Sequence, residues 1–94
     1  MIALTETDIR IRLNDLEDWT FLNNQIYKDY IFADFNAAIE FVNQIAVIAN
    51  EIDHHPDILI HSYKKVKIML STHDAGGITE NDFKLAGLIE QLIK

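Results

Sequence analysis

Hydrophobic residues recur along the chain with two different spacings, one typical of helices and one typical of strands. The helical spacing is clearest from residue 35 to residue 52, where apolar side chains fall three and four positions apart. This pattern predicts that the longest helix of the protein covers residues 35–52. Shorter helices are predicted over residues 5–16 and from residue 79 nearly to Lys94. Each of these begins with a threonine followed three positions later by an aspartate, which resembles a capping box.

Between these helices, two stretches have the alternation of β-hairpins. From residue 19 to residue 32, aromatic and β-branched residues flank an Asn-Asn pair at 23 and 24. A second hairpin is predicted to pair residues 57–61 with residues 64–72 and to turn near residues 62 and 63. Val66, Ile68, Leu70 and Thr72 would share one face of its longer strand.

The predicted order is therefore αββαββα, within a single domain spanning residues 1–94. Two hairpins and three helices favour the α+β class, with a four-stranded antiparallel sheet and helices packed on one face. The other face, or an edge strand, would then expose apolar side chains. Pairing with a second copy would cover them, so we expect a homodimer or homotetramer.

Composition and charge limit the possible functions. The formal net charge is −7, which would repel a phosphate backbone, so no nucleic-acid partner is expected. The one basic cluster, Lys64, Lys65 and Lys67, is interpreted as a solvated strand edge. The chain has no cysteine, and seven of its first twenty residues are charged. We therefore expect a soluble, cytoplasmic protein with no signal peptide and no membrane segment.

Three histidines stand at the ends of predicted elements. The stretch D-H-H-P places His54 and His55 before the only proline, Pro56, which disfavours helical geometry at His55. The pair should therefore lie at a corner between helix and strand, while His73 ends a strand ahead of a Gly-Gly turn. Imidazoles can give and take protons near neutral pH, although a histidine taken singly is more often a structural or surface residue. His61, near the second hairpin turn, is expected to have no catalytic role.

Other site chemistries fit the sequence less well. Adjacent histidines in an extended segment point to opposite sides and would not easily bind one ion, and no H-E-x-x-H helix is present. The sequence also lacks a G-x-S-x-G nucleophile elbow and a phosphate-binding P-loop motif. We therefore do not expect metal catalysis, a serine-histidine-acid hydrolase or a phosphate-binding loop.

The histidine stretches carry a family resemblance. Residues 50–63 read N-E-I-D-H-H-P-D-I-L-I-H-S-Y, and residues 72–82 read T-H-D-A-G-G-I-T-E-N-D. Together they resemble the signature of the pterin-4a-carbinolamine dehydratases. The resemblance covers nearly the whole chain, since Trp19, the I-F-A-D-F run at 31–35, Phe41 and the D-F-K-L-A run at 82–86 are also similar to that family. It implies the αββαββα fold predicted above.

The resemblance also implies an activity. It is the dehydration of 4a-hydroxytetrahydropterin to quinonoid dihydropterin, which recycles the pterin after an aromatic amino-acid hydroxylase has used it. By carry-over of the signature, His54 and His73 would be the acid and base, and His55 would hold and polarise the pterin. Asp82 would orient a histidine, in addition to or instead of capping the last helix. The reaction implies no metal or redox cofactor.

One position departs from the family pattern. Where the family commonly has an acid, this chain has Asn50, which supplies no charge to a neighbouring histidine. Asp53 or Asp57 could compensate, or could simply belong to the turn around Pro56. A non-catalytic binding role remains the alternative, either as a dimerisation cofactor of a transcription factor or as a pterin-dependent regulator.

Overall fold

The computed structural model describes residues 1–93. Its elements are α1 (Glu6–Leu13), β1 (Thr20–Leu22), β2 (Gln25–Ile31), α2 (Phe35–Ile52), β3 (Asp57–His61), β4 (Lys65–Leu70), a short 3₁₀ turn η1 (His73–Ala75) and α3 (Glu80–Gln91). The strands form one antiparallel sheet in the order β1-β2-β4-β3. The predicted αββαββα order and the α+β class are confirmed.

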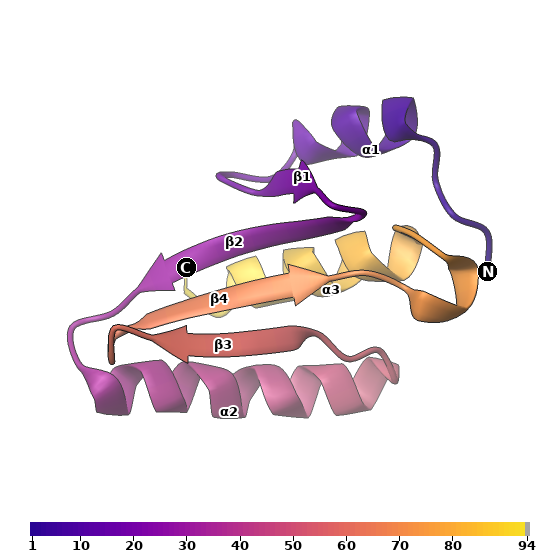
Figure 1. Ribbon diagram of the computed structural model, residues 1–94. Coiled ribbons are helices and arrows are strands. Elements are labelled where there is room, and N and C mark those ends of the chain that lie inside the picture. The colour runs from indigo at the N-terminus through magenta and orange to yellow at the C-terminus, as the bar shows by residue number, and fades with distance from the viewer. Residues whose placement is uncertain (94) are drawn as a thin grey trace.

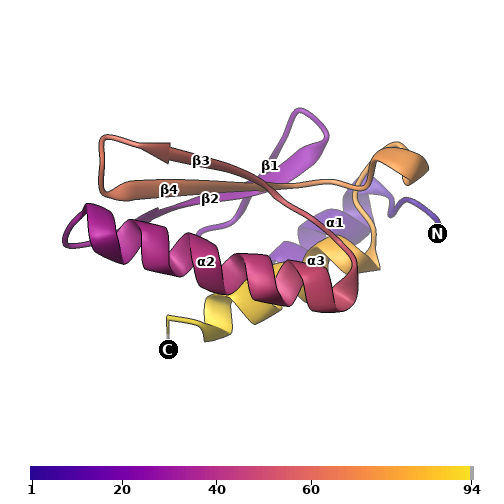
Figure 2. The same ribbon diagram turned by 90° about the horizontal axis from the view of Figure 1, so that it is seen from below.

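The three helices lie on one face of the sheet (Figures 1 and 2), as predicted. The core fills the space between these layers, because alternate residues of β2 and β4 point toward the helices. Its most deeply buried members include Ile26, Val66, Ile68 and Leu70 from the sheet, Ala38 and Ile45 from α2, and Leu85, Ala86 and Ile89 from α3. Among residues 1–93, no helix is both long enough and apolar enough to cross a membrane.

The uncovered face of the sheet is mixed in character. The register pairs Asp29 with Lys67 on this face, and Lys65 lies opposite Ile31. Exposed apolar side chains are Leu22 on β1, Ile31 on β2 and Leu59 on β3. Two of these lie on edge strands, so apolar exposure concentrates at the margins of the sheet.

Both hairpins turn where the sequence predicts. Asn23 and Asn24 have φ of 53° and 61°, and Ser62 and Tyr63 have φ of 50° and 51°. Positive φ at both central residues is what a two-residue turn needs to match the twist of its strands. Asparagine tolerates this conformation better than most residues, which explains the Asn-Asn pair.

Three predicted boundaries differ from the structure. The first helix ends at Leu13 rather than residue 16, because the chain continues in tighter turns in which the Leu16 N–H donates to the Leu13 carbonyl at 3.0 Å. The strand β4 ends at Leu70, and Thr72 is joined to Gly77 by an isolated bridge. The last helix ends at Gln91, and Lys94 lies outside the described residues.

A buried polar cluster joins β2 to α3. Lys28 Nζ lies 3.0 Å from both carboxylate oxygens of Glu90 and donates to the Glu17 carbonyl at 2.9 Å. The Tyr30 hydroxyl donates to the same carboxylate. Burial, and then the hydrogen bond to Glu90, raise the pKa of Tyr30. The phenol therefore stays protonated in the folded protein well above its usual range.

Candidate active site

The D-H-H-P stretch forms the corner that the sequence predicts. The helix α2 ends at Ile52, and Asp53 caps it in the left-handed region with φ of 52°. The His54 N–H still reaches back to the Ala49 carbonyl, at 3.1 Å. The chain then leaves the helix, since Pro56 rejects helical geometry at the residue before it, and β3 begins at the next position. His54 and His55 are thus held at the end of a rigid helix.

His54 is paired with a buried carboxylate. Its Nε2 lies 2.6 Å from Asp82 Oδ1, and Asp82 is completely buried. Because a carboxylate oxygen accepts, Nε2 carries the hydrogen and Nδ1 remains free in the neutral ring. Asp82 Oδ2 accepts from the Thr79 N–H at 2.9 Å, which caps α3. Asp82 therefore caps the helix and orients His54 at the same time.

Thr72 is a third member of this network that the sequence reasoning did not single out. The Thr72 hydroxyl donates its one hydrogen to Asp82 Oδ2 at 2.9 Å. The Thr79 hydroxyl lies 2.8 Å from Thr72 Oγ1 and must therefore donate to that oxygen. The Thr72 N–H donates to the Gly77 carbonyl at 2.8 Å. One residue thus fixes the Asp82 carboxylate with its side chain and the base of the His73 loop with its backbone. The signal was present, because Thr72 belongs to the T-H-D-A-G-G stretch.

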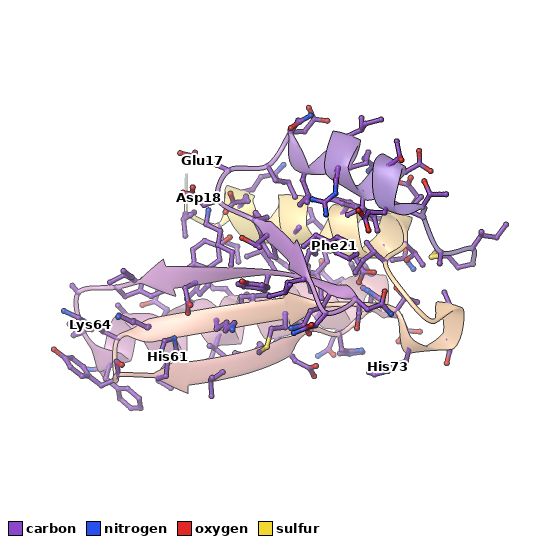
Figure 3. All side chains as sticks on the ribbon, turned by 45° about the horizontal axis from the view of Figure 1, so that its top comes forward. Glu17, Asp18, Phe21, His61, Lys64 and His73 are labelled. Atoms are coloured by element: carbon purple, nitrogen blue, oxygen red, sulfur yellow. The ribbon has the colours of Figure 1, made fainter. Side chains whose placement is uncertain are left out.

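His73 begins the turn η1, which Gly76 ends with φ of 72°. The side chain is exposed, and it makes no hydrogen bond within residues 1–93. Figure 3 shows His73 beyond one end of β4, whereas Lys64 lies at the other end of that strand. It faces a hollow of about 190 Å³, lined by Asp53, His54, His55, Ser71, Thr72, His73 and Asp74. The three histidines that the sequence singled out therefore line one hollow.

Asn50 contacts His55, and not His54 as the sequence analysis considered. Its Oδ1 lies 3.0 Å from His55 Nε2. The amide oxygen accepts, so the His55 hydrogen is on Nε2 and its Nδ1 is free. His55 therefore lies beside an uncharged amide, whereas His54 lies beside the Asp82 carboxylate.

The remaining candidate residues lie outside this network. Figure 3 places His61 along the sheet, away from His73. Its Nε2 lies 2.7 Å from Asp29 Oδ1, in agreement with a structural or surface role. Pro56 is half-buried and shapes the corner. Within the described residues, no group of three His, Asp or Glu side chains is arranged to hold a metal ion.

This arrangement suits proton transfer to and from a small bound molecule. Two imidazoles from different elements line the hollow, one held nearly buried by a carboxylate and one exposed. An imidazole can act as acid or base near neutral pH, and a carboxylate partner fixes its tautomer and orientation. The arrangement is therefore chemically suited to general acid–base catalysis.

The chain is similar to known proteins over nearly its whole length. The family model described as "Pterin 4 alpha carbinolamine dehydratase" matches residues 2–92. A relative from Sulfurisphaera tokodaii is 45% identical over 93 residues, which cover 99% of each chain. A relative from Picosynechococcus is 47% identical over 89 residues, covering 95% of this chain and 96% of its own. Both are named, provisionally, pterin-4-alpha-carbinolamine dehydratases. The chain belongs to the pterin-4a-carbinolamine dehydratase family.

Solved structures support the same fold. A "transcriptional coactivator/pterin dehydratase" from Brucella melitensis superposes with a TM-score of 0.91 at 32% identity, covering 98% of this chain and 99% of the other. A pterin dehydratase-like protein described as a RuBisCO assembly factor of the alpha-carboxysome has a TM-score of 0.66 at 20% identity, over 82% and 90% of the two chains. The second comparison shows a shared fold alone.

Proposed function

We propose that this protein dehydrates 4a-hydroxytetrahydropterin to quinonoid dihydropterin and water. The observation that carries the proposal is that His54 and His73 line one hollow, with His54 held by the buried Asp82. In the reaction the C4a–O bond breaks and the oxygen leaves as water. An adjacent ring N–H loses its proton, and a C=N double bond forms. One acid and one base meet both proton demands, so the chemistry requires no metal or redox cofactor.

The geometry suggests a division of labour among the histidines. His54 exchanges its proton through Nδ1, because Nε2 is committed to Asp82. His73 is the second acid or base, on the exposed wall of the hollow. His55, fixed through Nε2 by Asn50, has a free Nδ1 with which to bind and polarise the pterin. Asp82, Asn50 and Pro56 are then support residues that hold these rings in place.

The proposed place of this activity follows from its substrate. A hydroxylase that oxidises a tetrahydropterin, such as an aromatic amino-acid hydroxylase, releases the carbinolamine that this protein would consume. We also propose that the chain self-associates as a dimer or tetramer, through the exposed apolar residues at the margins of its sheet. Light scattering at micromolar concentration should report a mass at least twice the 10.8 kDa of one chain. A monomer alone would contradict this.

The central test measures turnover. The carbinolamine is generated enzymatically, and its disappearance is followed with and without the protein. The protein should accelerate the loss, and dialysis against a strong chelator should leave the rate unchanged. A rate equal to the spontaneous one would overturn the proposal. A stoichiometric metal whose removal abolished turnover would instead overturn the assignment of the proton transfers to histidines alone.

A non-catalytic function is the second candidate. It is favoured by the similarity to the Brucella melitensis protein, which is described as a transcriptional coactivator/pterin dehydratase. This chain would then act as a dimerisation cofactor of a transcription factor or as a pterin-dependent regulator. The same turnover assay separates the two, since a purely binding protein would leave the spontaneous rate unchanged.

A further inference from the structure

The direction of the His73 ring depends on the backbone of the loop that carries it, residues 72–77. The ring is exposed, and its side chain makes no hydrogen bond within residues 1–93. Inside the loop, the Ala75 N–H donates to the Thr72 carbonyl at 3.1 Å, and the Gly76 N–H donates to the His73 carbonyl at 3.0 Å. These bonds shape the turn but do not attach it to the rest of the protein.

Backbone bonds hold the base of the loop. The Thr72 N–H donates to the Gly77 carbonyl at 2.8 Å, and the Gly77 N–H donates to the Thr72 carbonyl at 3.3 Å. Just beyond the loop, the Leu4 N–H donates to the Ile78 carbonyl at 2.7 Å. None of these bonds reaches the tip of the loop, residues 73–76, which carries the imidazole.

The turn between β1 and β2 provides an anchor for the tip. Ile26 pairs with Leu70, so this turn and the loop after β4 lie at the same end of the sheet (Figure 1). The Asn24 side-chain amide donates to the Gly76 carbonyl at 2.8 Å. Among the side-chain hydrogen bonds of the described residues, this is the one that reaches the tip. The approach needs a glycine at position 77, because a Cβ on Gly77 would lie 3.2 Å from Asn24 Oδ1.

We propose that Asn24 is a positioning residue that keeps His73 facing the hollow it shares with His54. This inference rests on the proposed function, in which His73 transfers a proton. A proton crosses only between groups within hydrogen-bond distance, so turnover depends on how much of the time the ring faces the substrate. Without the bond from Asn24, the tip could swing on its base. The ring would keep its chemistry but would face the hollow less often, which lowers kcat more than it changes KM.

The test removes the bond and keeps the turn. Asn24 has φ of 61°, which aspartate and glycine also tolerate. Asn24→Asp places an acceptor opposite the Gly76 carbonyl, and Asn24→Gly removes the side chain without adding charge. Each should lower kcat about three- to tenfold, as expected for one hydrogen bond, with KM changed by less than about twofold. Asn23→Asp is the matched control, because Asn23 shares the turn, with φ of 53°, but does not bond to the loop.

A double substitution tests whether Asn24 acts through His73. In the His73→Ala protein, assayed at high protein concentration, adding Asn24→Asp should cause no further loss, because no imidazole remains to be positioned. A loss by the same factor in both backgrounds would show that Asn24 acts elsewhere and would overturn the proposal. Wild-type kcat in both Asn24 variants would overturn it as well.

A measurement without substrate separates this inference from the proposed function. Relaxation of the backbone amide nitrogens should give lower order parameters for residues 74–76 in Asn24→Asp than in wild type or Asn23→Asp. Such loosening in a protein that does not accelerate dehydration would support the anchor and overturn the dehydratase. Unchanged order parameters in Asn24→Asp, in a protein that does accelerate dehydration, would overturn the anchor and leave the dehydratase intact.

Discussion

The carboxylate of Asp82 joins the imidazole of His54 to the first turn of α3. Oδ1 lies 2.6 Å from His54 Nε2, and Oδ2 accepts from the Thr79 N–H at 2.9 Å. The orientation of His54 is therefore coupled to the start of a helix that packs in the core. Any shift of that helix end would be transmitted to the imidazole.

Substitution at Asp82 should separate stability from catalysis. Asp82→Ala should lower the free energy of unfolding by about 1–3 kcal/mol, because it removes a cap and leaves buried donors unpaired. In Asp82→Asn the remaining oxygen can still cap the helix, but the amide NH₂ faces His54 and disfavours its tautomer. We expect kcat to fall at least tenfold, with a smaller loss of stability. Urea unfolding and steady-state kinetics measure the two effects. Asp34→Asn, at the cap of α2, is the control and should leave kcat unchanged.

Single histidine substitutions should differ in kind. His54→Ala and His73→Ala should mainly lower kcat, by up to about 10² to 10⁴ for each group that transfers a proton. Each loss could be incomplete if the two rings share the work, so the double variant should be nearly inactive. Near wild-type kcat in the double variant, with an unchanged circular dichroism spectrum, would show that the corner is purely architectural.

The His55→Ala variant should behave differently, mainly raising KM. A binding contact made equally in the ground and transition states affects KM alone. His61→Ala is the control, because His61 contacts Asp29 on the sheet and not the hollow. A large fall in kcat for His55→Ala with unchanged KM would place His55 among the proton-transfer groups instead.

Thr72 provides a test of the network behind the histidines. Thr72→Val keeps the shape of the side chain but leaves the Asp82 carboxylate without one donor and the Thr79 hydroxyl without its acceptor. We expect a loss of about 1–3 kcal/mol in unfolding free energy, together with a lower kcat. Thr72→Ser retains the hydroxyl and should recover most of both quantities. Equal behaviour of the two variants would show that the hydroxyl is unimportant.

Much of the fold could be predicted because its signals are local. The spacing in α2, the Asn-Asn turn and the proline after His55 each act within a few residues. The end of α1 was misplaced because Leu16, although outside the helix, still packs against the core and keeps the helical spacing. Apolar spacing records burial, and burial does not require that the helix continue.

The candidate site was only partly predictable from the sequence. His54 and Asp82 are 28 positions apart, so no periodicity relates them, and only the family resemblance suggested that Asp82 orients a histidine. From its distance along the chain, Asn50 was expected to affect His54. In the structure, the end of α2 instead brings His55 within hydrogen-bond distance of Asn50. Thr72 was assigned to a strand and to the T-H-D-A-G-G stretch but was given no role, because its bond to Asp82 depends on how α3 docks.

The buried phenol of Tyr30 should make stability depend on alkaline pH. Its pKa is about 10 in the unfolded chain and is raised in the folded protein, so folding favours the protonated form. This contribution is fully present below about pH 10 and is lost as pH rises further, at about 1.4 kcal/mol per pH unit. Urea midpoints between pH 9 and 11.5 should fall less steeply for Tyr30→Phe than for wild type. Tyr63→Phe, at an exposed tyrosine, should keep the wild-type slope.

The unequal exposure of the two histidines proposed to transfer protons has a kinetic consequence. The His54 side chain is only 11% exposed, whereas His73 is open to solvent. After each proposed turnover both rings must regain their starting protonation, and His73 can do so directly with bulk water or buffer. His54 is shielded, so its recharging must pass through the emptied hollow. At high substrate concentration, proton exchange by His54 would compete with the binding of the next substrate molecule. The maximal rate would then rise with the concentration of a small buffer that can enter the hollow and exchange a proton with His54.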